Sequence, residues 1–303
     1  MVERYRSSVE LLYWALEREQ IRLQKLAGLP PPWTKDPILT KYRFCNVRRR
    51  DDRVSQWLLN YAYHHDAFIS QYVFIQWVAL CRWVNWPPLL RELLAAGLVG
   101  PDHIDLATIG NAIDDRVKLG AKSWTGAYMV RAPSKNKYPG VGKGQFVAET
   151  VVGALRDQDV FMRMMMALPE KSLRRAQEVW EVLCSVPNWG SFMAGQVVAD
   201  LSYTPILEGA TDLNTWAPQG PGSRRGFNRL LRRPLYNKID PNEWSDRLQY
   251  WREDLIGAFG RSEYAYSLTL MDVQNCLCEV DKYLRVKAGE GRPRSTYKPE
   301  TEF

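Results

Sequence analysis

Apolar residues recur at helical spacing along most of the chain, and turn-forming residues separate the resulting segments. Trp124–Val130 is an exception whose pattern favours a short strand, and a polar, glycine-rich loop follows over 133–144. We therefore expect a mainly α-helical fold with at most a small β excursion. Helices are predicted over 3–27, 52–64, 66–84, 86–97, 103–119, 146–167, 169–184, 190–203, 222–231, 241–257 and 263–286.

The segments differ in how much of their surface is apolar. Residues 66–84 are apolar or aromatic almost throughout, which predicts a buried helix. Residues 3–27 carry a single apolar stripe between charges, formed by Val9, Leu12, Tyr13, Leu16, Ile21, Leu23 and Leu26. We expect one compact helical domain over 1–287, with helices of 1–120 packed on a core at about 165–285, and a basic tail over 288–303.

The clearest local signal is the turn Val186-Pro187-Asn188-Trp189-Gly190 between two helical patterns. Pro187 fixes one backbone angle, and Gly190 tolerates torsion angles that other residues resist. This is typical of a helix-hairpin-helix module, in which backbone N–H groups bind a DNA phosphate. We predict DNA contacts at Asn188, Trp189, Gly190, Arg229 and Arg292.

Composition narrows the class of protein. Apolar residues make up 46% of the 303 residues and charged residues 25%, which is typical of a globular protein. The net charge of +7 is clustered in arginine runs, which favours a nucleic-acid partner. Five cysteines and three histidines form no metal pattern, and no apolar run of about 18 residues predicts a membrane span. Neither metal nor membrane is therefore expected.

Two arginine clusters are candidate phosphate sites. Phe44–Arg53 contains four cations, two acids and Asn46, and Arg224-Arg225 follows a Gly-Pro-Gly turn. Guanidinium groups bind phosphate through two parallel hydrogen bonds, so we expect both clusters to converge on one pocket. Helix capping with surface ion pairs explains the first cluster equally well.

The predicted last helix carries polar residues where a buried helix would have apolar ones. Asp272, Cys276 and Glu279 share one stripe, and Gln274, Cys278 and Asp281 share another. These groups either connect neighbouring helices or line a pocket. Pro139–Gly144 lacks the spacing of a phosphate-binding Walker loop. For His64-His65-Asp66 a structural or substrate-contact role is favoured over a metal site.

Long segments of the chain resemble the α-glutamyl/putrescinyl-thymine pyrophosphorylase family. They are LAGLPPPWTKDPIL, KYRFCNVRRRDDRVSQWL, VPNWGSFMAGQVVADL, WAPQGPGSRRGFNRL and DVQNCLCEVDKYLRVKAGEGRPRS. The resemblance implies a helix-hairpin-helix, DNA-glycosylase-like fold. It also implies a phage amino acid:DNA transferase, which displaces (pyro)phosphate from 5-(pyro)phosphomethyl-deoxyuridine with an amino-acid amine, most simply that of glycine or serine.

Such a reaction requires a base to leave the helical stack, cations for the leaving group and a carboxylate to take the proton of the amine. We predict Asp212, Asp272 and Glu279 as catalytic acids. The predicted substrate-binding residues are Asn46, Arg48, Arg49, Asp52, Arg53, Asn214, Trp216, Arg224, Arg225, Asn228, Gln274 and Lys282. Lys282 or Arg229 is the expected anchor for the amino-acid carboxylate.

The expected partners are double-stranded DNA with activated 5-hydroxymethyluracil and a free amino acid, with no cofactor. We expect a monomer in the cytoplasm of an infected bacterial host. A non-catalytic protein that binds modified DNA, or a base-excising glycosylase, remains an alternative on the same residues.

Overall fold

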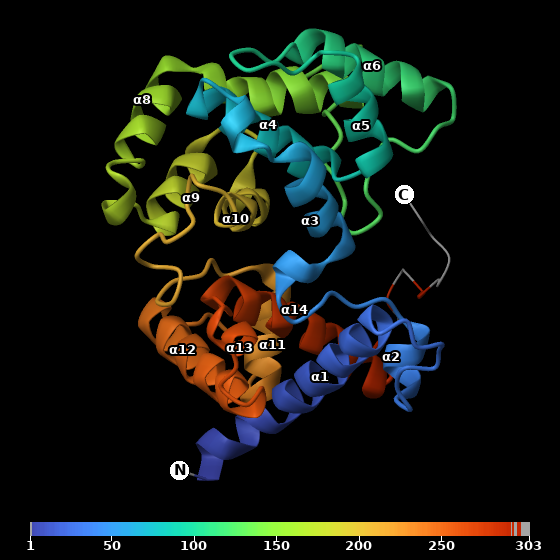
Figure 1. Ribbon diagram of the computed structural model, residues 1–303, viewed down its shortest axis with the longest axis vertical. Helices are drawn as coiled ribbons and strands as arrows, with labels where there is room; N and C mark the ends of the chain where they lie inside the picture. The colour runs from blue at the N-terminus through green and yellow to red at the C-terminus, as the bar shows by residue number, and fades with distance from the viewer. Residues whose placement is uncertain (1, 292, 294–295, 298–303) are drawn as a thin grey trace. The chain divides into compact units, whose positions relative to one another are not determined.

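The computed structural model describes residues 2–291, 293, 296 and 297, and among these it contains helices and loops but no β-strand (Figure 1). The prediction of a mainly α-helical fold is confirmed. The chain divides into two compact units, and we call them unit 1, which runs to Asp52 and resumes at Asp212, and unit 2, which is Arg53–Thr211. Unit 1 therefore combines a segment before residue 53 with one after residue 211, whereas the sequence predicted a single domain with a core at 165–285.

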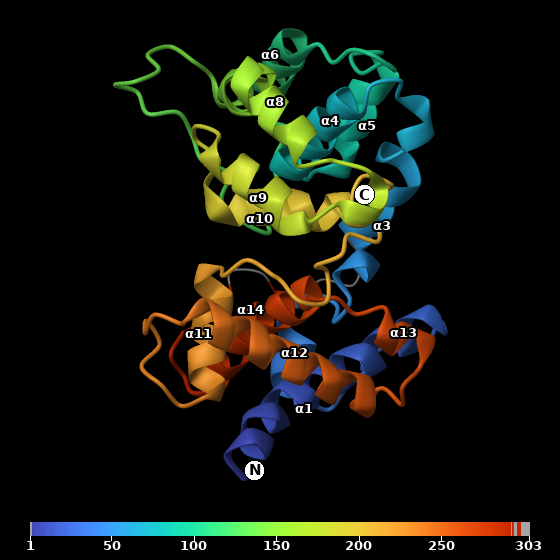
Figure 2. The same cartoon turned by 90° about the vertical axis from the view of Figure 1, so that its left-hand side faces the viewer.

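Unit 1 is built around one long helix, α14 (Leu270–Lys287). It packs against four other helices of the unit, and Figure 2 shows α11 and α12 beside it. The remaining helices of this unit are α1 (Val2–Leu26), α2 (Pro37–Lys41), α11 (Pro221–Leu230), α12 (Pro241–Ala258) and α13 (Glu263–Tyr266), with a 3₁₀ turn at Arg49–Asp51.

Two glycines allow α11 to approach α14 closely. A Cβ atom at Gly226 would lie 2.1 Å from the carbonyl oxygen of Leu277, and one at Gly222 would lie 3.1 Å from the Sγ of Cys278. Pro221 begins the helix, where its fixed φ angle is favourable. The Gly-Pro-Gly turn and Gly226 thus serve helix packing.

The buried face of α1 differs from the predicted stripe. Leu11, Trp14 and Ala15 are fully buried, whereas Leu16 and Leu23 are exposed. The predicted stripe is therefore wrong for most of its members, since Val9, Tyr13 and Leu26 are exposed as well. The helix has apolar residues on two faces, and the sequence alone does not show which face meets α12 and α14.

Unit 2 is also entirely helical in its regular elements. They are α3 (Arg53–Trp57) with a π-helical turn (Leu58–Ala62), a 3₁₀ turn (His65–Ala67), α4 (Gln71–Val84), α5 (Pro87–Ala95), α6 (Leu106–Lys118), α7 (Lys143–Gln145) with π and 3₁₀ continuations (Phe146–Val152, Gly153–Arg156), α8 (Gln158–Met166), a 3₁₀ turn (Lys171–Leu173), α9 (Ala176–Ser185) and α10 (Gly190–Leu201). The helix α4 is buried along nearly its whole length, as predicted.

The strand predicted at Trp124–Val130 is absent. The backbone N–H of Thr125 donates to the carbonyl of Val84 at 3.1 Å, and the hydroxyl of Tyr128 donates to the carbonyl of Arg82. This segment therefore satisfies hydrogen bonds at the end of α4 instead of pairing with another strand.

A buried ion pair connects α4 and α10 inside unit 2. The Nε of Arg82 donates to the Oδ2 of Asp200 at 2.7 Å, and the hydroxyl of Tyr63 donates to the same oxygen at 2.7 Å. Asp200 is 1% exposed, and its carboxylate therefore has a structural role in unit 2. A buried carboxylate requires such partners because desolvation strongly disfavours an unpaired charge.

The close approach of α11 to α14 makes Gly226 intolerant of a side chain. We expect Gly226→Ala to destabilise the protein by roughly 1–3 kcal/mol, because the added methyl group meets helix backbone that cannot rotate away. Gly257→Ala in α12 is the matched control, since its Cβ would have no neighbour within 4 Å, and it should stabilise by about 0.5–1 kcal/mol. Denaturant unfolding measures both, and equal effects would contradict this packing.

Candidate functional site

The irregular segment 42–52 of unit 1 is held by buried carboxylates. The backbone N–H of Cys45 donates to the Oε2 of Glu279 at 2.9 Å, and that of Arg49 donates to the Oδ1 of Asp272 at 2.8 Å. Both acceptors lie on one stripe of α14. Because an irregular backbone lacks internal partners, these two side chains fix the position of the segment on the helix.

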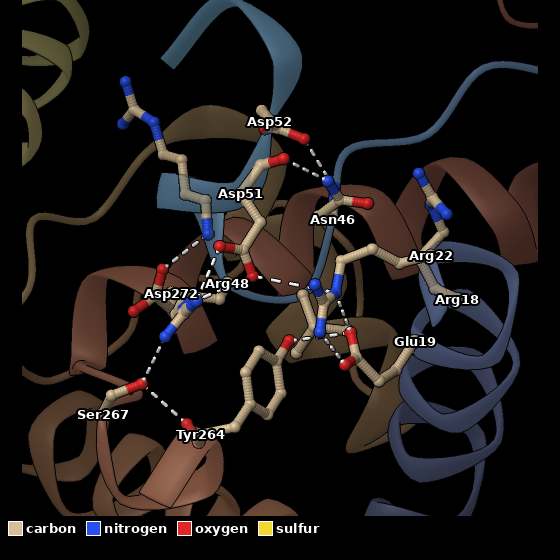
Figure 3. A network of polar contacts seen from close by, with 12 residues as sticks. Arg18, Glu19, Arg22, Asn46, Arg48, Asp51, Asp52, Tyr264, Ser267 and Asp272 are labelled. Carbon is tan, nitrogen blue, oxygen red and sulfur yellow. Dashed lines mark hydrogen bonds and ion pairs between the residues drawn. The ribbon is translucent and has the colours of Figure 1, made fainter. Parts of the chain in front are cut away.

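The segment also closes on itself (Figure 3). The backbone N–H of Asn46 donates to the Oδ1 of Asp52 at 2.7 Å, and the Nδ2 of Asn46 donates to the carbonyl of Asp51 at 2.7 Å. Arg48 forms an ion pair with Asp51 at 2.7 Å and donates to the hydroxyl of Ser267 at 3.0 Å. The guanidinium of Arg48 is thus already engaged by protein groups.

The helix α1 contributes an arginine that the sequence did not single out. The Nε of Arg18 donates to the carbonyl of Cys45 at 3.0 Å, and its Nη2 donates to that of Phe44 at 3.3 Å. Its Nη1 is buried and has no hydrogen-bond partner among the described residues, and the same holds for the Oδ1 of Asn46. A signal was present, because Arg18 follows Leu11 and Trp14 at helical spacing on the buried face.

Burial shifts the pKa values of Arg18 and of the nearby Asp52. Burial raises the pKa of Asp52 to about 6, although Arg18 and the Asn46 N–H oppose that rise. Burial lowers the pKa of Arg18, and the charges of Asp52 and Glu279 oppose that fall. A carboxyl group with a pKa near 6 is suited to exchanging protons at neutral pH. Burial raises the pKa of the Cys45 thiol well above its usual value, which disfavours a thiolate nucleophile.

Two of the three predicted acids, Asp272 and Glu279, lie on α14, and both are bound by other groups of the protein. Asp272 caps the helix, since its Oδ2 accepts from both the backbone N–H and the hydroxyl of Thr269 at 2.9 Å. Glu279 pairs with Lys282 at 2.6 Å. Asp212 is 3% exposed in a turn that joins the start of α14 through the Leu270 N–H and the Leu213 carbonyl. In that turn, Trp216 is partly buried and Asn214 is exposed.

The second arginine cluster lies elsewhere on the same helix. Arg225 and Arg229 pair with the two oxygens of Asp281 at 2.9 and 3.2 Å, and Arg229 also pairs with Glu290. Asp281 is nine residues beyond Asp272, which is about two and a half helical turns and the opposite face of α14. The predicted convergence of the two clusters is therefore wrong.

The other predicted ligands of unit 1 have structural partners or point to solvent. Lys282 donates to the Arg43 carbonyl at 3.0 Å as well as pairing with Glu279, and Gln274 donates to the Ser223 hydroxyl at 2.9 Å. Asn228 is fully buried and holds the turn after α11 through two backbone carbonyls, so it is not positioned for substrate. Arg224 is exposed, and Arg292 lies outside the described residues.

Unit 2 contains a pocket at the predicted hairpin. It has a volume of about 490 Å³ and is bounded by the turn 186–190 and by Trp83, Met129, Arg131, Cys184, Ser185 and Met193. No side chain caps the amino terminus of α10, which begins at Gly190. The exposed Arg131 and the helix terminus favour an anion in this pocket.

Arg53, which was predicted to bind substrate, also belongs to unit 2, and its side chain is exposed.

The hairpin turn has the predicted torsions, but its tryptophan has another role. Asn188 and Gly190 have φ angles of 70° and 72°. Trp189 is 4% exposed, and its Nε1 donates to the Val151 carbonyl at 2.8 Å, with its ring edge-on to Trp83. The ring of Trp189 therefore supports the turn from inside, and it is not exposed for the predicted contact with DNA.

Backbone N–H groups at the end of the glycine-rich loop 139–144 donate hydrogen bonds to the carboxylate of Asp114. The Oδ1 of Asp114 accepts from the Gly144 N–H at 2.6 Å, and its Oδ2 accepts from the Gln145 N–H at 3.0 Å. These amides therefore bind an internal anion. The described residues contain no group of three or more His, Cys, Asp or Glu suited to a metal, and no described helix is long and apolar enough to cross a membrane.

Comparison with known proteins identifies the family. Residues 7–292 match the family described as "5-hmdU DNA kinase, helical domain". The chain belongs to this family. A 5-hmdU DNA kinase of Bacillus phage SP10 is 25% identical over 301 residues, covering 91% of this chain and 44% of the phage protein. The chain thus spans less than half the length of that relative, and no solved structure matches.

The raised pKa of Asp52 predicts a pH-dependent stability. Between about pH 4 and pH 6 the folded protein keeps a proton that the unfolded chain has lost, so the free energy of unfolding falls as the pH rises through this window. Asp52→Asn should therefore be more stable than the wild type at pH 7, by on the order of 1–2 kcal/mol, and equal to it near pH 4. Asn retains an oxygen for the Asn46 N–H.

Denaturant unfolding at both pH values measures the difference. The same substitution at the exposed Asp102 controls for net charge. A stability difference that is the same at pH 4 and pH 7 would show that Asp52 is not the group responsible.

Proposed function

We propose that the chain is an enzyme of phage thymine hypermodification that transfers an amino acid to an activated 5-hydroxymethyluracil in DNA. The family match over residues 7–292 is the observation that carries the proposal, because that family is named after a kinase of 5-hmdU in DNA. In the glycine-rich loop, the amides of Gly144 and Gln145 donate to Asp114 and are therefore not available to a phosphate.

The proposed reaction is a displacement at the exocyclic methylene carbon of the base. The neutral amine of the amino acid forms a C–N bond, and the C–O bond to the phosphate or pyrophosphate breaks, with its electron pair leaving on that oxygen. The neutral amine forms when the ammonium group of the amino acid gives one proton to a carboxylate before the attack, and the product nitrogen remains protonated. Asp52 supports this step because its pKa of about 6 lies close to neutral pH.

DNA binding is proposed at the hairpin pocket of unit 2. Three features of this pocket suit an anion. The start of α10 has no side-chain cap, Asn188 has a left-handed backbone conformation, and Arg131 adds an exposed positive charge. A backbone phosphate of DNA is the anion that such a turn fits. Contacts to phosphate position a protein on DNA but do not read its sequence.

A second function has support from one particular observation. The match covers 44% of the phage SP10 kinase, so the chain corresponds to less than half of that protein. In this second function the helical domain recognises 5-hydroxymethyluracil in DNA for a catalytic partner, and its acids have structural roles alone.

One assay separates the two functions. DNA carrying pyrophosphorylated or phosphorylated 5-hydroxymethyluracil is incubated with the protein and pooled amino acids, and the nucleosides are analysed by mass spectrometry. A transferase yields a nucleoside with the mass of an attached amino acid, and Asp52→Asn should lower its rate at least tenfold because the amine then keeps its proton. Asp102→Asn is the control. Binding to this DNA without any new nucleoside would support the recognition function and contradict the transferase.

A further inference from the structure

Several buried side-chain atoms of unit 1 have no hydrogen-bond partner among the described residues, and two of them belong to side chains that meet at segment 42–52. They are the Nη1 of Arg18, a donor, and the Oδ1 of Asn46, an acceptor. Buried polar groups are nearly always hydrogen-bonded, because losing water without a replacement is unfavourable. A ligand that carries both an acceptor and a donor would satisfy the Nη1 of Arg18 and the Oδ1 of Asn46.

Both side chains are fixed by their other hydrogen bonds. The two remaining nitrogens of Arg18 bind the carbonyls of Phe44 and Cys45, which directly precede Asn46. The Nδ2 of Asn46 binds the Asp51 carbonyl, which also determines which end of the carboxamide is oxygen. Figure 3 shows that oxygen pointing away from Asp51 and Asp52. The orientation of both atoms is thus set before any ligand arrives.

The charges around the pair select the chemistry of the ligand. Asp52 and Glu279 are close enough to Arg18 to affect its pKa, so cation and carboxylates share one environment. A phosphate would meet two carboxylates, and a metal ion would meet a guanidinium. A molecule that carries a carboxylate and an ammonium group matches both signs.

We propose that Arg18, Asn46 and Asp52 form the binding site for the free α-amino acid that the transferase uses. This inference rests on the function proposed above and names its second substrate and the place where it binds. The Nη1 of Arg18 donates to the carboxylate of the amino acid, and its ammonium group donates to the Oδ1 of Asn46 and to Asp52. Arg18 thereby replaces Lys282 and Arg229, which are paired with Glu279 and Asp281.

In this site Asp52 is the base that accepts a proton from the bound amino acid. One proton moves from the bound ammonium group to the carboxylate of Asp52, which leaves a neutral amine and a neutral carboxyl group. The Oδ1 of Asp52 still accepts from the Asn46 N–H, so the loop stays closed during the exchange. Asp52 releases the proton to solvent after transfer.

Isothermal titration of the DNA-free protein with glycine, serine and glutamate tests the site, with putrescine as a diamine that has no carboxylate. We expect the wild type to bind at least one amino acid, and Arg18→Met to weaken that binding at least tenfold without weakening any binding of putrescine. Asn46→Ala should weaken amino-acid binding as well and carries the test if Arg18→Met fails to fold.

Arg22→Met is the matched control one turn further along α1. Arg22 also contacts segment 42–52, through Asp51 at 3.8 Å, but it is paired with Glu19. It should leave amino-acid binding within twofold of the wild type. Failure of all three amino acids to bind, or an equal loss in Arg22→Met and Arg18→Met, would overturn the site.

The same variants in the mass-spectrometric assay keep the two proposals apart. If the wild type and Arg18→Met transfer an amino acid at the same rate, the proposed site is wrong and the proposed transferase activity stands. Arg18-dependent binding of an amino acid without transfer to any activated DNA would support the site and overturn the transferase.

Discussion

Carboxylates that accept hydrogen bonds from the backbone are the interaction on which unit 1 depends. Segment 42–52 has little regular structure, so its buried N–H groups need acceptors from outside. Asp272 of α14 accepts a hydrogen bond from the Arg49 N–H, and Glu279 accepts one from the Cys45 N–H. Within the segment, Asp52 accepts one from the Asn46 N–H. The acids that the sequence marks as chemical are therefore first of all structural, and the segment they hold orients Arg18 and Asn46.

This arrangement separates groups that support the fold from groups that remain available to a ligand. Ion pairs with acids of the protein engage three arginines that the sequence suggested as ligand-binding residues, namely Arg48, Arg225 and Arg229. Arg18 differs, because its partners are backbone carbonyls that use two of its three nitrogens. A guanidinium held in this way keeps its charge and one directed donor, which suits recognition of a carboxylate.

The spacing of apolar and polar residues predicted most helices and the two polar stripes of α14, and Pro187 and Gly190 predicted the hairpin turn. All of these features follow from local sequence. The spacing did not predict which face of α1 is buried, since Leu16 and Trp14 are both apolar and only the neighbouring helices decide between them. The same limit explains Trp189, whose exposed or buried state depends on Val151 and Trp83 from other parts of unit 2. Candidate acids were found, but their partners in segment 42–52 lie more than 200 residues away in sequence.

Hydrogen exchange of individual amides tests the central interaction most directly. If the carboxylates hold segment 42–52, the N–H groups of Cys45, Asn46 and Arg49 exchange slowly in the wild type, although they lie outside helices. Asp272→Ala should then accelerate exchange at Arg49 and along the segment, while the amides of α10 in unit 2 keep their protection. Rapid exchange at these three amides in the wild type, or protection unchanged by Asp272→Ala, would contradict the account.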